Sequence, residues 1–123
     1  MQYEAMESKI LEFKERLDDY GRLLETITAF ANTQGGTIII GIRDSDRTVV
    51  GLERDEIVRY SRELPQGIVD SISPQIAVDR YEQHIGGKTC VTLRVFPGPQ
   101  QPHFIKRNGY PNGVFLRFGS HNR

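Results

Sequence analysis

The hydrophobic positions of residues 22–34, RLLETITAFANTQ, fall on one side of a helix. Apolar side chains recur there at helical spacing, at Leu23, Leu24, Ile27, Phe30 and Ala31. Gly35-Gly36 ends this predicted helix, because glycine tolerates positive φ. The next residues, TIIIGI at 37–42, form a continuous apolar run, which is typical of a strand buried on both faces.

The rest of the chain predicts one more helix and several short strands. The helix covers residues 53–72, with a break or kink expected at Pro65 because proline cannot donate the helical hydrogen bond. The strands are TVVGL at 48–52 after a turn at 44–46, a hairpin of 76–84 with 88–96 around Gly86-Gly87, and a second hairpin of 103–107 with 114–118 around NGYPNG. This order of elements predicts an α+β or α/β sandwich.

The stretch ESKILEFKE, residues 7–15, fits two structures. Apolar residues spaced by three and four, from Met6 through Ile10 and Phe13 to Leu24, favour a helix. A strand would instead place Leu11 and Phe13 in the core, with Glu12 and Lys14 on the opposite face. The periodicity alone therefore predicts a helix, and only Gly21 argues locally against one long helix.

Composition is that of an ordinary soluble protein. The chain has 123 residues, 37% of them hydrophobic and 26% charged, so one domain with one modest core is expected. No apolar run reaches the ~18 residues of a membrane span, and the acidic N-terminus lacks the layout of a secretion signal. Cys90 is the only cysteine, which excludes a disulfide framework and a cysteine zinc cluster. A reducing, cytoplasmic location is expected.

The formal net charge is zero, but the charges are unevenly distributed along the chain. Acidic residues are concentrated in the first 19 residues, and none follows Glu82. The stretch after Glu82 carries only basic charges, at Lys88, Arg94, Lys106, Arg107, Arg117 and Arg123. Such asymmetry is typical of a surface that faces phosphate groups, and it also arises from solvated side chains without a ligand.

Several separate blocks of the sequence resemble the Schlafen-type AlbA-like domain. The blocks are ESKILEFKE, ETITAFANTQGGTIIIGIRDSDRTVVGL and GVFLRFGSHNR. They match, in order, the Glu-x4-Glu-Phe-Lys motif of that family, its Ala-Phe-Ala-Asn helix end followed by Gly-Gly, and its late Arg-x-Gly-Ser. The resemblance spans nearly the whole chain. It implies an α+β, AlbA-like sandwich with a mixed β-sheet, two main helices and a C-terminal hairpin, and it implies a strand for residues 8–15.

The resemblance also implies a function. Domains of this family are nucleic-acid-binding modules of bacterial and archaeal proteins, often regulators of transcription, and some are described as ATP-binding. In animal Schlafens a related domain cuts transfer and ribosomal RNA with three acids, and the matching positions here are Glu7, Glu12 and Asp44. Animal Schlafens combine two such lobes and hold zinc, whereas this chain has one lobe and one cysteine. No zinc is therefore expected, and a comparable groove needs a second copy.

The chemistry of an acidic trio is consistent with a divalent metal. Mg²⁺ and Mn²⁺ prefer hard oxygen ligands, and either ion activates water for phosphodiester hydrolysis at neutral pH. Glu7, Glu12 and Asp44 are the candidate catalytic residues and metal ligands, and Lys14 is placed to stabilise developing charge. The alternative is that both glutamates are solvated and Asp44 is a turn residue. Whether the domain cleaves or only binds stays open at this point.

The C-terminal segment alternates aromatic rings with cations. Rings stack on unpaired bases and cations meet phosphates, which is the pattern of single-strand binders. The candidate nucleic-acid-binding residues are Lys106, Arg107, Arg117, Ser120 and Arg123, with Arg117 to Ser120 forming an anion contact. The expected partner is RNA of the transfer-RNA kind or single-stranded DNA, bound by a homodimer. The alternative is an oligomerisation or ATP-binding module of a regulator, and the chain is expected to be an N-terminal domain or a short stand-alone form.

Overall fold

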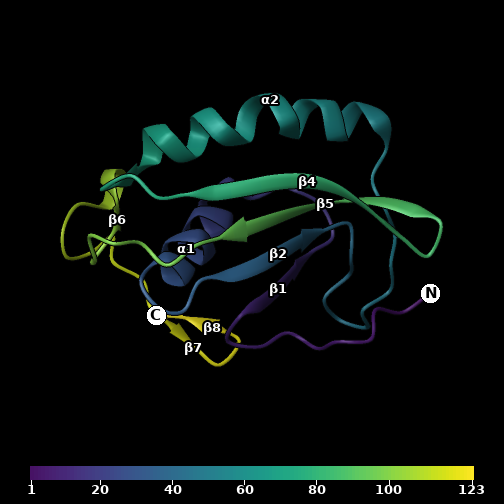
Figure 1. Cartoon of the computed structure of the whole chain (residues 1–123), viewed down its shortest axis with the longest axis horizontal. Helices are drawn as coiled ribbons and strands as arrows, with labels where there is room; N and C mark the ends of the chain where they lie inside the picture. Colours follow the sequence, from purple (N-terminus) through teal and green to yellow (C-terminus); the bar gives the residue numbers. More distant parts are fainter.

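A four-stranded mixed β-sheet forms the centre of the molecule (Figure 1). The computed structural model describes all residues from 1 to 123. The strand order is β1-β2-β5-β4, in which β1 runs parallel to β2 and the other neighbours are antiparallel. These strands are β1 (Leu11–Lys14), β2 (Gly36–Ile40), β4 (Val78–Ile85) and β5 (Lys88–Val95). The predicted hairpin of β4 and β5 is confirmed.

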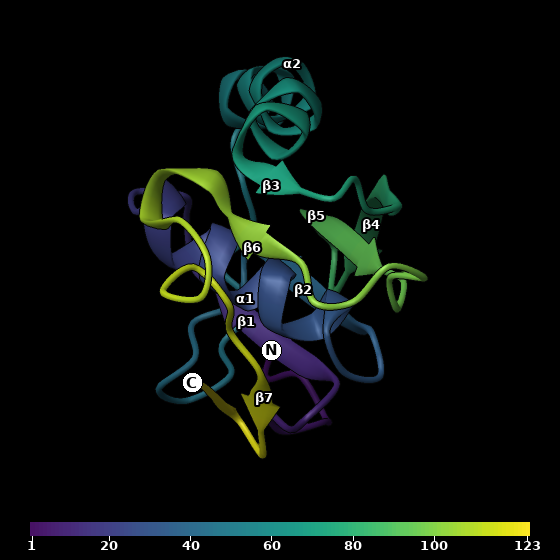
Figure 2. The ribbon, with the colours of Figure 1, turned by 90° about the vertical axis from the view of Figure 1, so that its left-hand side faces the viewer.

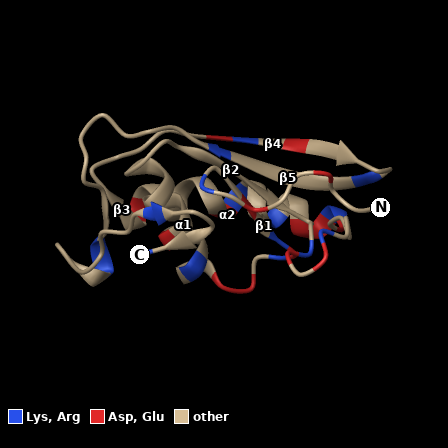
Figure 3. Cartoon of the chain, turned by 90° about the horizontal axis from the view of Figure 1, so that it is seen from below, with Lys and Arg blue, Asp and Glu red and all other residues tan.

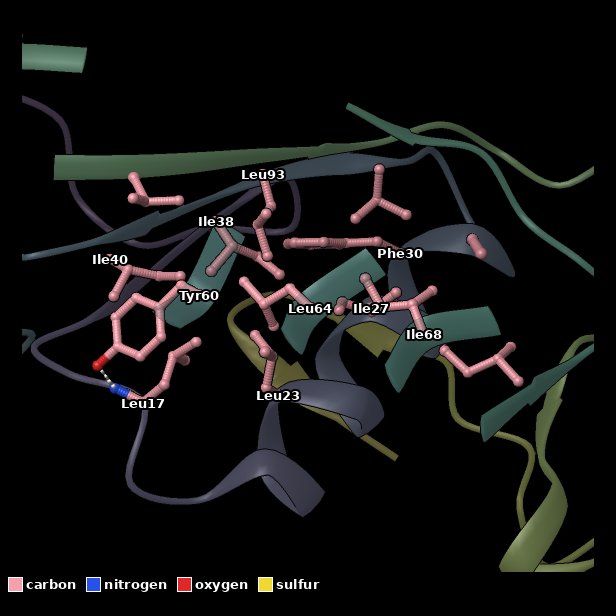
Figure 4. Packing of buried hydrophobic residues seen from close by; sticks show 14 of the residues in the cluster. Leu17, Leu23, Ile27, Phe30, Ile38, Ile40, Tyr60, Leu64, Ile68 and Leu93 are labelled. Carbon is pink, nitrogen blue, oxygen red and sulfur yellow. Dashed lines mark hydrogen bonds between the residues drawn. The ribbon is translucent and has the colours of Figure 1, made fainter. Parts of the chain in front are cut away.

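Two helices, α1 (Tyr20–Ala31) and α2 (Arg54–Ser71), cover one face of this sheet. Their apolar side chains pack on the sheet residues Ile38, Ile40 and Leu93, as Figure 4 shows. The Tyr60 hydroxyl of α2 accepts a hydrogen bond from the Leu17 N–H at 3.2 Å. The amphipathic pattern of each helix is therefore explained by this shared core.

A second, smaller cluster covers the opposite face of the sheet. It consists of Phe13, Ile39, Ile42, Val49, Ile85 and Cys90. Since successive side chains of a strand point to opposite faces, Ile39 enters this cluster while Ile38 and Ile40 face the helices. The prediction of a strand buried on both faces is confirmed.

The opening stretch contains a strand and not the start of a helix, although the strand covers residues 11–14 and not the predicted 8–15. Met6 and Ile10, which the helical periodicity places in a core, are 71% and 53% exposed, whereas Phe13 is 1% exposed. The helix begins only at Tyr20, with Asp19 as its N-cap. The spacing of three and four in residues 6–17 is therefore coincidental, and parallel pairing with β2 decides the structure of β1.

The predicted break at Pro65 is wrong, because α2 runs without interruption from Arg54 to Ser71 with Pro65 inside it, whereas a kink there stays a prediction. Pro65 is exposed, and so is Ser61, whose carbonyl loses its helical partner to the proline ring. An exposed carbonyl without a helical partner costs little, because it is open to solvent. A capping box of Glu53 and Glu56 stabilises the start of the helix.

The predicted pairing of residues 103–107 with 114–118 is also wrong. Phe104 and Ile105 form β6, which pairs with β3 (Ile72–Ser73), and a short turn of 3₁₀ helix, η1 (Lys106–Asn108), follows. The C-terminal hairpin is shorter and later, between β7 (Arg117–Phe118) and β8 (His121–Asn122). The segment TVVGL forms only isolated bridges, one of them between Ile42 and Val49.

The observed elements confirm the α+β class, with two main helices on a mixed sheet. Neither helix combines the length and the apolar character that crossing a membrane requires.

Candidate functional site

The outer edge of β1 is closed by the two residues that open the Glu-x4-Glu-Phe-Lys motif. The Phe13 N–H donates to the Glu7 carboxylate at 2.9 Å, and the Leu11 carbonyl accepts from the Ser8 N–H at 2.9 Å. Both groups would otherwise be unpaired at a sheet edge. Glu7 therefore has a structural role, because its carboxylate accepts the hydrogen bond that a neighbouring strand would otherwise accept.

Arg117 is a buried cation that ties the C-terminal hairpin to β1. Its side chain is fully buried, and its guanidinium carbon lies 4.9 Å from the centre of the Phe30 ring. The guanidinium donates to the Glu12 carboxylate at 2.9 Å, to the Ser8 carbonyl at 2.8 Å and to the Asn122 side chain at 2.8 Å. This set of acceptors compensates the desolvation of the charge.

The Glu12 carboxylate lies between two cations. One oxygen accepts from Arg117, and the other lies 3.6 Å from the Lys14 ammonium. Glu12 and Lys14 share the helix-covered face of β1, as the strand hypothesis requires, and both are largely buried. The carboxylate is thus neutralised within the chain.

This environment raises the pKa of Glu7. Partial burial raises its pKa above the usual value, and the negative charges of Glu12 and Asp44 add to the rise, while the Phe13 N–H and Arg117 oppose it. The structure therefore brings the other two predicted acids, Glu12 and Asp44, into electrostatic range of Glu7. Asp44 itself is exposed, and the carboxylate that forms the turn is that of Asp46, which accepts from the Thr48 N–H at 3.0 Å.

The three acids do not form a closed metal shell in this arrangement. No group of three or more Asp, Glu, His or Cys side chains lies close enough together to hold a metal ion. One oxygen of Glu7 is bonded to the Phe13 N–H, and both oxygens of Glu12 face cations. The residues therefore do not fit the expected Mg²⁺ or Mn²⁺ site, and the catalytic roles of Glu7, Glu12, Asp44 and Lys14 stay predictions.

A polar depression of about 320 Å³ opens beside this cluster. Phe13, Lys14, Glu15, Arg16, Asp18 and Asp44 line it. Its charges are mixed, because Arg16 pairs with Glu56 at 2.9 Å and Glu15 pairs with Arg43 at 3.3 Å. Figure 3 shows basic and acidic segments side by side around β1. Such a surface does not favour a polyanion by charge alone.

A different surface lies at the end of the molecule that Figure 2 faces. There η1 and the C-terminal hairpin expose Lys106, Arg107 and Arg123, none of which is paired with an acidic side chain. Two aromatic rings accompany them: Tyr110 is 66% exposed and Phe118 is 53% exposed. The Arg123 guanidinium carbon lies 5.8 Å from the centre of the Phe118 ring. We call these five residues the C-terminal basic surface.

Two of the predicted nucleic-acid contacts, Arg117 and Ser120, differ in their exposure to solvent. Arg117 is 1% exposed and its donors are engaged within the chain, so its prediction as a surface phosphate contact is corrected. Ser120 is partly exposed in the turn between β7 and β8, beside Gly119, whose φ of 56° requires the left-handed region. Ser120 therefore stays a prediction.

Two features were not found from the sequence. Asn32, at the end of α1, is buried and binds two distant segments: its side chain donates to the carbonyls of His103 and Phe115 and accepts from the His103 N–H. An open hollow of about 330 Å³ lies where Arg94 and Phe96 meet Gly35 and Gly36. In the sequence, the position of Asn32 directly after the apolar face of the predicted helix was the available signal for its buried contacts.

Taken together, the fold and site define an α+β domain in which an N-terminal acidic motif and a C-terminal Arg-x-Gly-Ser segment meet at one edge of a mixed sheet. The chain belongs to the Schlafen AlbA_2 family, since the family model described as "Schlafen, AlbA_2" matches residues 7–123.

Three relatives are similar to this chain over different extents. An uncharacterized ATP-binding protein of Ureaplasma parvum is 34% identical over 75 residues, which is 58% of this chain and 21% of that protein. The N-terminal domain of a putative ATP-dependent DNA helicase RecG-related protein from Nitrosomonas europaea is 29% identical, with a TM-score of 0.61 over 92% of this chain and 80% of that one. The DIP2311 protein from Corynebacterium diphtheriae has a TM-score of 0.66 and 22% identity over 94% of this chain and 22% of that protein, which shows the fold alone.

Proposed function

We propose that this domain binds single-stranded nucleic acid through the C-terminal basic surface. One observation carries the proposal. Lys106, Arg107 and Arg123 are exposed and have no acidic partner within ion-pair distance, and the same two segments expose the rings of Tyr110 and Phe118.

Single strands suit this surface better than a duplex does. Exposed rings stack on bases that a duplex keeps inside, and base–ring stacking contributes about 1–3 kcal/mol per base. The cations supply the phosphate contacts, which are independent of sequence. Stacking on Phe118 competes with its contact to Arg123, so the ring and the cation are expected to separate when a base and a phosphate arrive together.

The family supports a nucleic-acid-related role, and so does the likeness to the N-terminal domain of the RecG-related protein. The chain spans about a fifth of the curated relative it matches, so the activity of that whole protein is not transferred. A role as the nucleic-acid-binding part of a transcriptional regulator is the larger context that the family resemblance implies.

Fluorescence anisotropy with labelled RNA and DNA strands of equal length tests the proposal. Lys106→Glu and Arg123→Glu are expected to weaken binding at least about tenfold, because each replaces a phosphate contact by a repulsion. Lys88→Glu makes the same charge change at the turn between β4 and β5, at the other end of the molecule (Figure 1), and should leave affinity nearly unchanged. Equal losses in all three variants, or no binding at low salt, would refute the proposed surface.

The same strands address the two alternatives. Incubation with Mn²⁺ and, separately, with a chelator tests cleavage. Products that depend on Mn²⁺ and vanish in Asp44→Asn, which changes an exposed member of the trio, would establish the endoribonuclease alternative. The name of the Ureaplasma relative points to ATP. ATP that displaces the strands in competition would favour a nucleotide site, whereas unchanged anisotropy supports nucleic acid as the ligand.

A further inference from the structure

The two edges of the sheet differ in whether their outward backbone groups have partners. At one edge, Glu7, Ser8 and Arg117 engage the outward backbone groups of β1. At the other edge, β4 pairs only with β5, and no segment lies beyond it in Figure 3. An open edge of eight residues is long for a monomer, because a free edge invites pairing with another chain.

The register identifies the free backbone groups of β4. Gly86 and Gly87 form a two-residue turn, so Ile85 and Lys88 are a bonded pair, and the bond from the Phe96 N–H to the Ala77 carbonyl keeps the same alternation. In an antiparallel pair, every second residue directs its N–H and C=O groups away from the neighbouring strand. In β4 these outward groups have no backbone partner elsewhere. The residues that carry them are Val78, Arg80, Glu82 and His84.

We propose that β4 pairs antiparallel with β4 of a second copy, about a two-fold axis at Tyr81. In this register Arg80 lies opposite Glu82 of the second copy, and by symmetry the pair forms twice. The neighbouring registers that use the same backbone groups place Arg80 opposite Arg80, or Glu82 opposite Glu82. Opposite charges across strands stabilise a pair and like charges destabilise it, so the sequence of β4 selects one register.

The surroundings of β4 fit this partner. The Arg80 Nη1 atom is buried and has no acceptor within the chain, while Nη2 donates to Ser61 at 3.0 Å. The guanidinium therefore has one unused donor, which Glu82 of the second copy would satisfy once the side chain turns toward the open edge. Glu82 is available, because its pair with Arg54 at 3.1 Å is exposed and contributes little. Tyr81 is 46% exposed, and at the axis it would cover its symmetry mate.

The side of α2 above β4 contributes a second contact. Pro65 and Val69 line a small apolar hollow with Val78 and Arg80, so this side of the helix faces the edge strand. Val58 lies seven residues before Pro65, which is about two helical turns and therefore the same side of α2. Val58 and Val69 are exposed at about half of their surface, 52% and 47%. A two-fold axis perpendicular to the sheet brings two copies of this stripe together. The interface is separate from the C-terminal basic surface, so it does not depend on nucleic-acid binding.

Cysteine trapping tests the register. Across the axis, residue 81 lies about 4.5 Å from its mate between α-carbons, which is within the range of ~4.4–6.8 Å that a disulfide spans. Asp79 is the matched control, since it faces Gln83 and lies about 13 Å from its own mate. Tyr81→Cys should therefore form covalent dimers at redox equilibrium, and Asp79→Cys should not. The native Cys90 is fully buried and does not interfere. Equal dimer yields, or none from Tyr81→Cys, would overturn the proposal.

Charge exchange tests the pairing without cysteines. Arg80→Glu and Glu82→Arg should each raise the dimer dissociation constant about tenfold or more, because each creates two like-charge contacts. The variant with both exchanges should regain the parental constant, measured by sedimentation. A chain that stays monomeric at every concentration, or single variants that dimerise as the parent does, would refute the interface. Because the cysteine variants retain Arg80 and Glu82, they decide the question if an exchange impairs folding.

Discussion

At the scale of single residues, Arg117 has a structural function that its position in an Arg-x-Gly-Ser segment does not reveal. Its guanidinium joins the C-terminal hairpin to β1 through Glu12, and its central carbon lies over the Phe30 ring of α1. Three elements distant in sequence therefore depend on one cation. The acid that the family resemblance assigns to catalysis is its counter-ion.

Arg117→Met should destabilise the fold by about 3–5 kcal/mol, the range for breaking a buried ion pair. The substitution leaves the Glu12 carboxylate with Lys14 alone and removes donors from Ser8 and Asn122. Urea denaturation measures the change. Arg123→Met is the control, since Arg123 is exposed, and it should stay within about 0.5 kcal/mol. A loss below 1 kcal/mol at Arg117 would contradict a structural role.

Glu7 should make stability depend on pH in the direction opposite to a salt-bridged acid. Its pKa in the folded state is raised above the usual 4.5, so the folded state binds the proton more tightly. Its contribution to stability is complete below pH 4.5 and is lost as the pH rises through the raised value. Glu7→Gln keeps an acceptor for the Phe13 N–H and removes the charge. The variant should therefore be at least as stable as the parent at pH 7, with the advantage disappearing near pH 4.

At the scale of elements, the connections of the C-terminal third depend on the end of α1. Asn32 is the C-cap of that helix, and its amide pairs with the backbone of residues 103 and 115. These residues therefore pair with a side chain of α1 and not with each other as strands. This explains why the apolar runs around them do not form the hairpin that their pattern predicts.

Asn32→Asp should loosen the C-terminal segment selectively. The carboxylate still accepts from the His103 N–H, but it cannot donate to the two carbonyls, each of which costs about 1–3 kcal/mol when left unpaired. Amide exchange should accelerate in residues 103–118 more than in β4 and β5. Asn108→Asp, in the exposed η1 turn, is the control and should change neither region. Uniform acceleration over the whole chain would mean that the segment is not an independent unit.

At the scale of the whole molecule, zero net charge conceals a division between two surfaces. The acidic N-terminal motif meets cations of its own chain around β1, whereas the C-terminal basic surface has no acidic partner. The long-range field is therefore expected to draw a polyanion to one end of the molecule.

Nucleic-acid binding should consequently depend on salt with a shallow slope. If three cations meet phosphates, the logarithm of the affinity should fall against the logarithm of salt with a slope of about −2, since single strands give roughly −0.7 per phosphate. Lys106→Ala should reduce the slope by about 0.7. Anisotropy across a salt series measures both, and Lys88→Ala should leave the slope unchanged. A slope near zero would contradict a phosphate-facing surface.

The sequence alone determined the elements whose patterns are long and local. The helix after Tyr20, the buried strand after Gly35-Gly36 and the hairpin around Gly86-Gly87 follow from periodicity and turn chemistry, and the structure confirms each. The order of the motif blocks determined the family. Charge along the chain determined which segment is free of carboxylates. All these properties are visible in the order of residues along the chain, so they can be predicted without knowing which distant residues meet.

Only the tertiary structure decided which residues meet. Strand β1 is four residues long, and its parallel neighbour follows more than twenty residues later, so local periodicity favoured a helix there. Arg117 pairs with Glu12, which lies 105 positions away in the sequence. Asn32 binds the carbonyls of His103 and Phe115, 71 and 83 positions away, which the predicted hairpin would have paired with each other's strand. Whether a charged side chain faces solvent or a buried counter-ion depends on packing, because the cost of burying a charge is offset only when partners from distant segments arrive together.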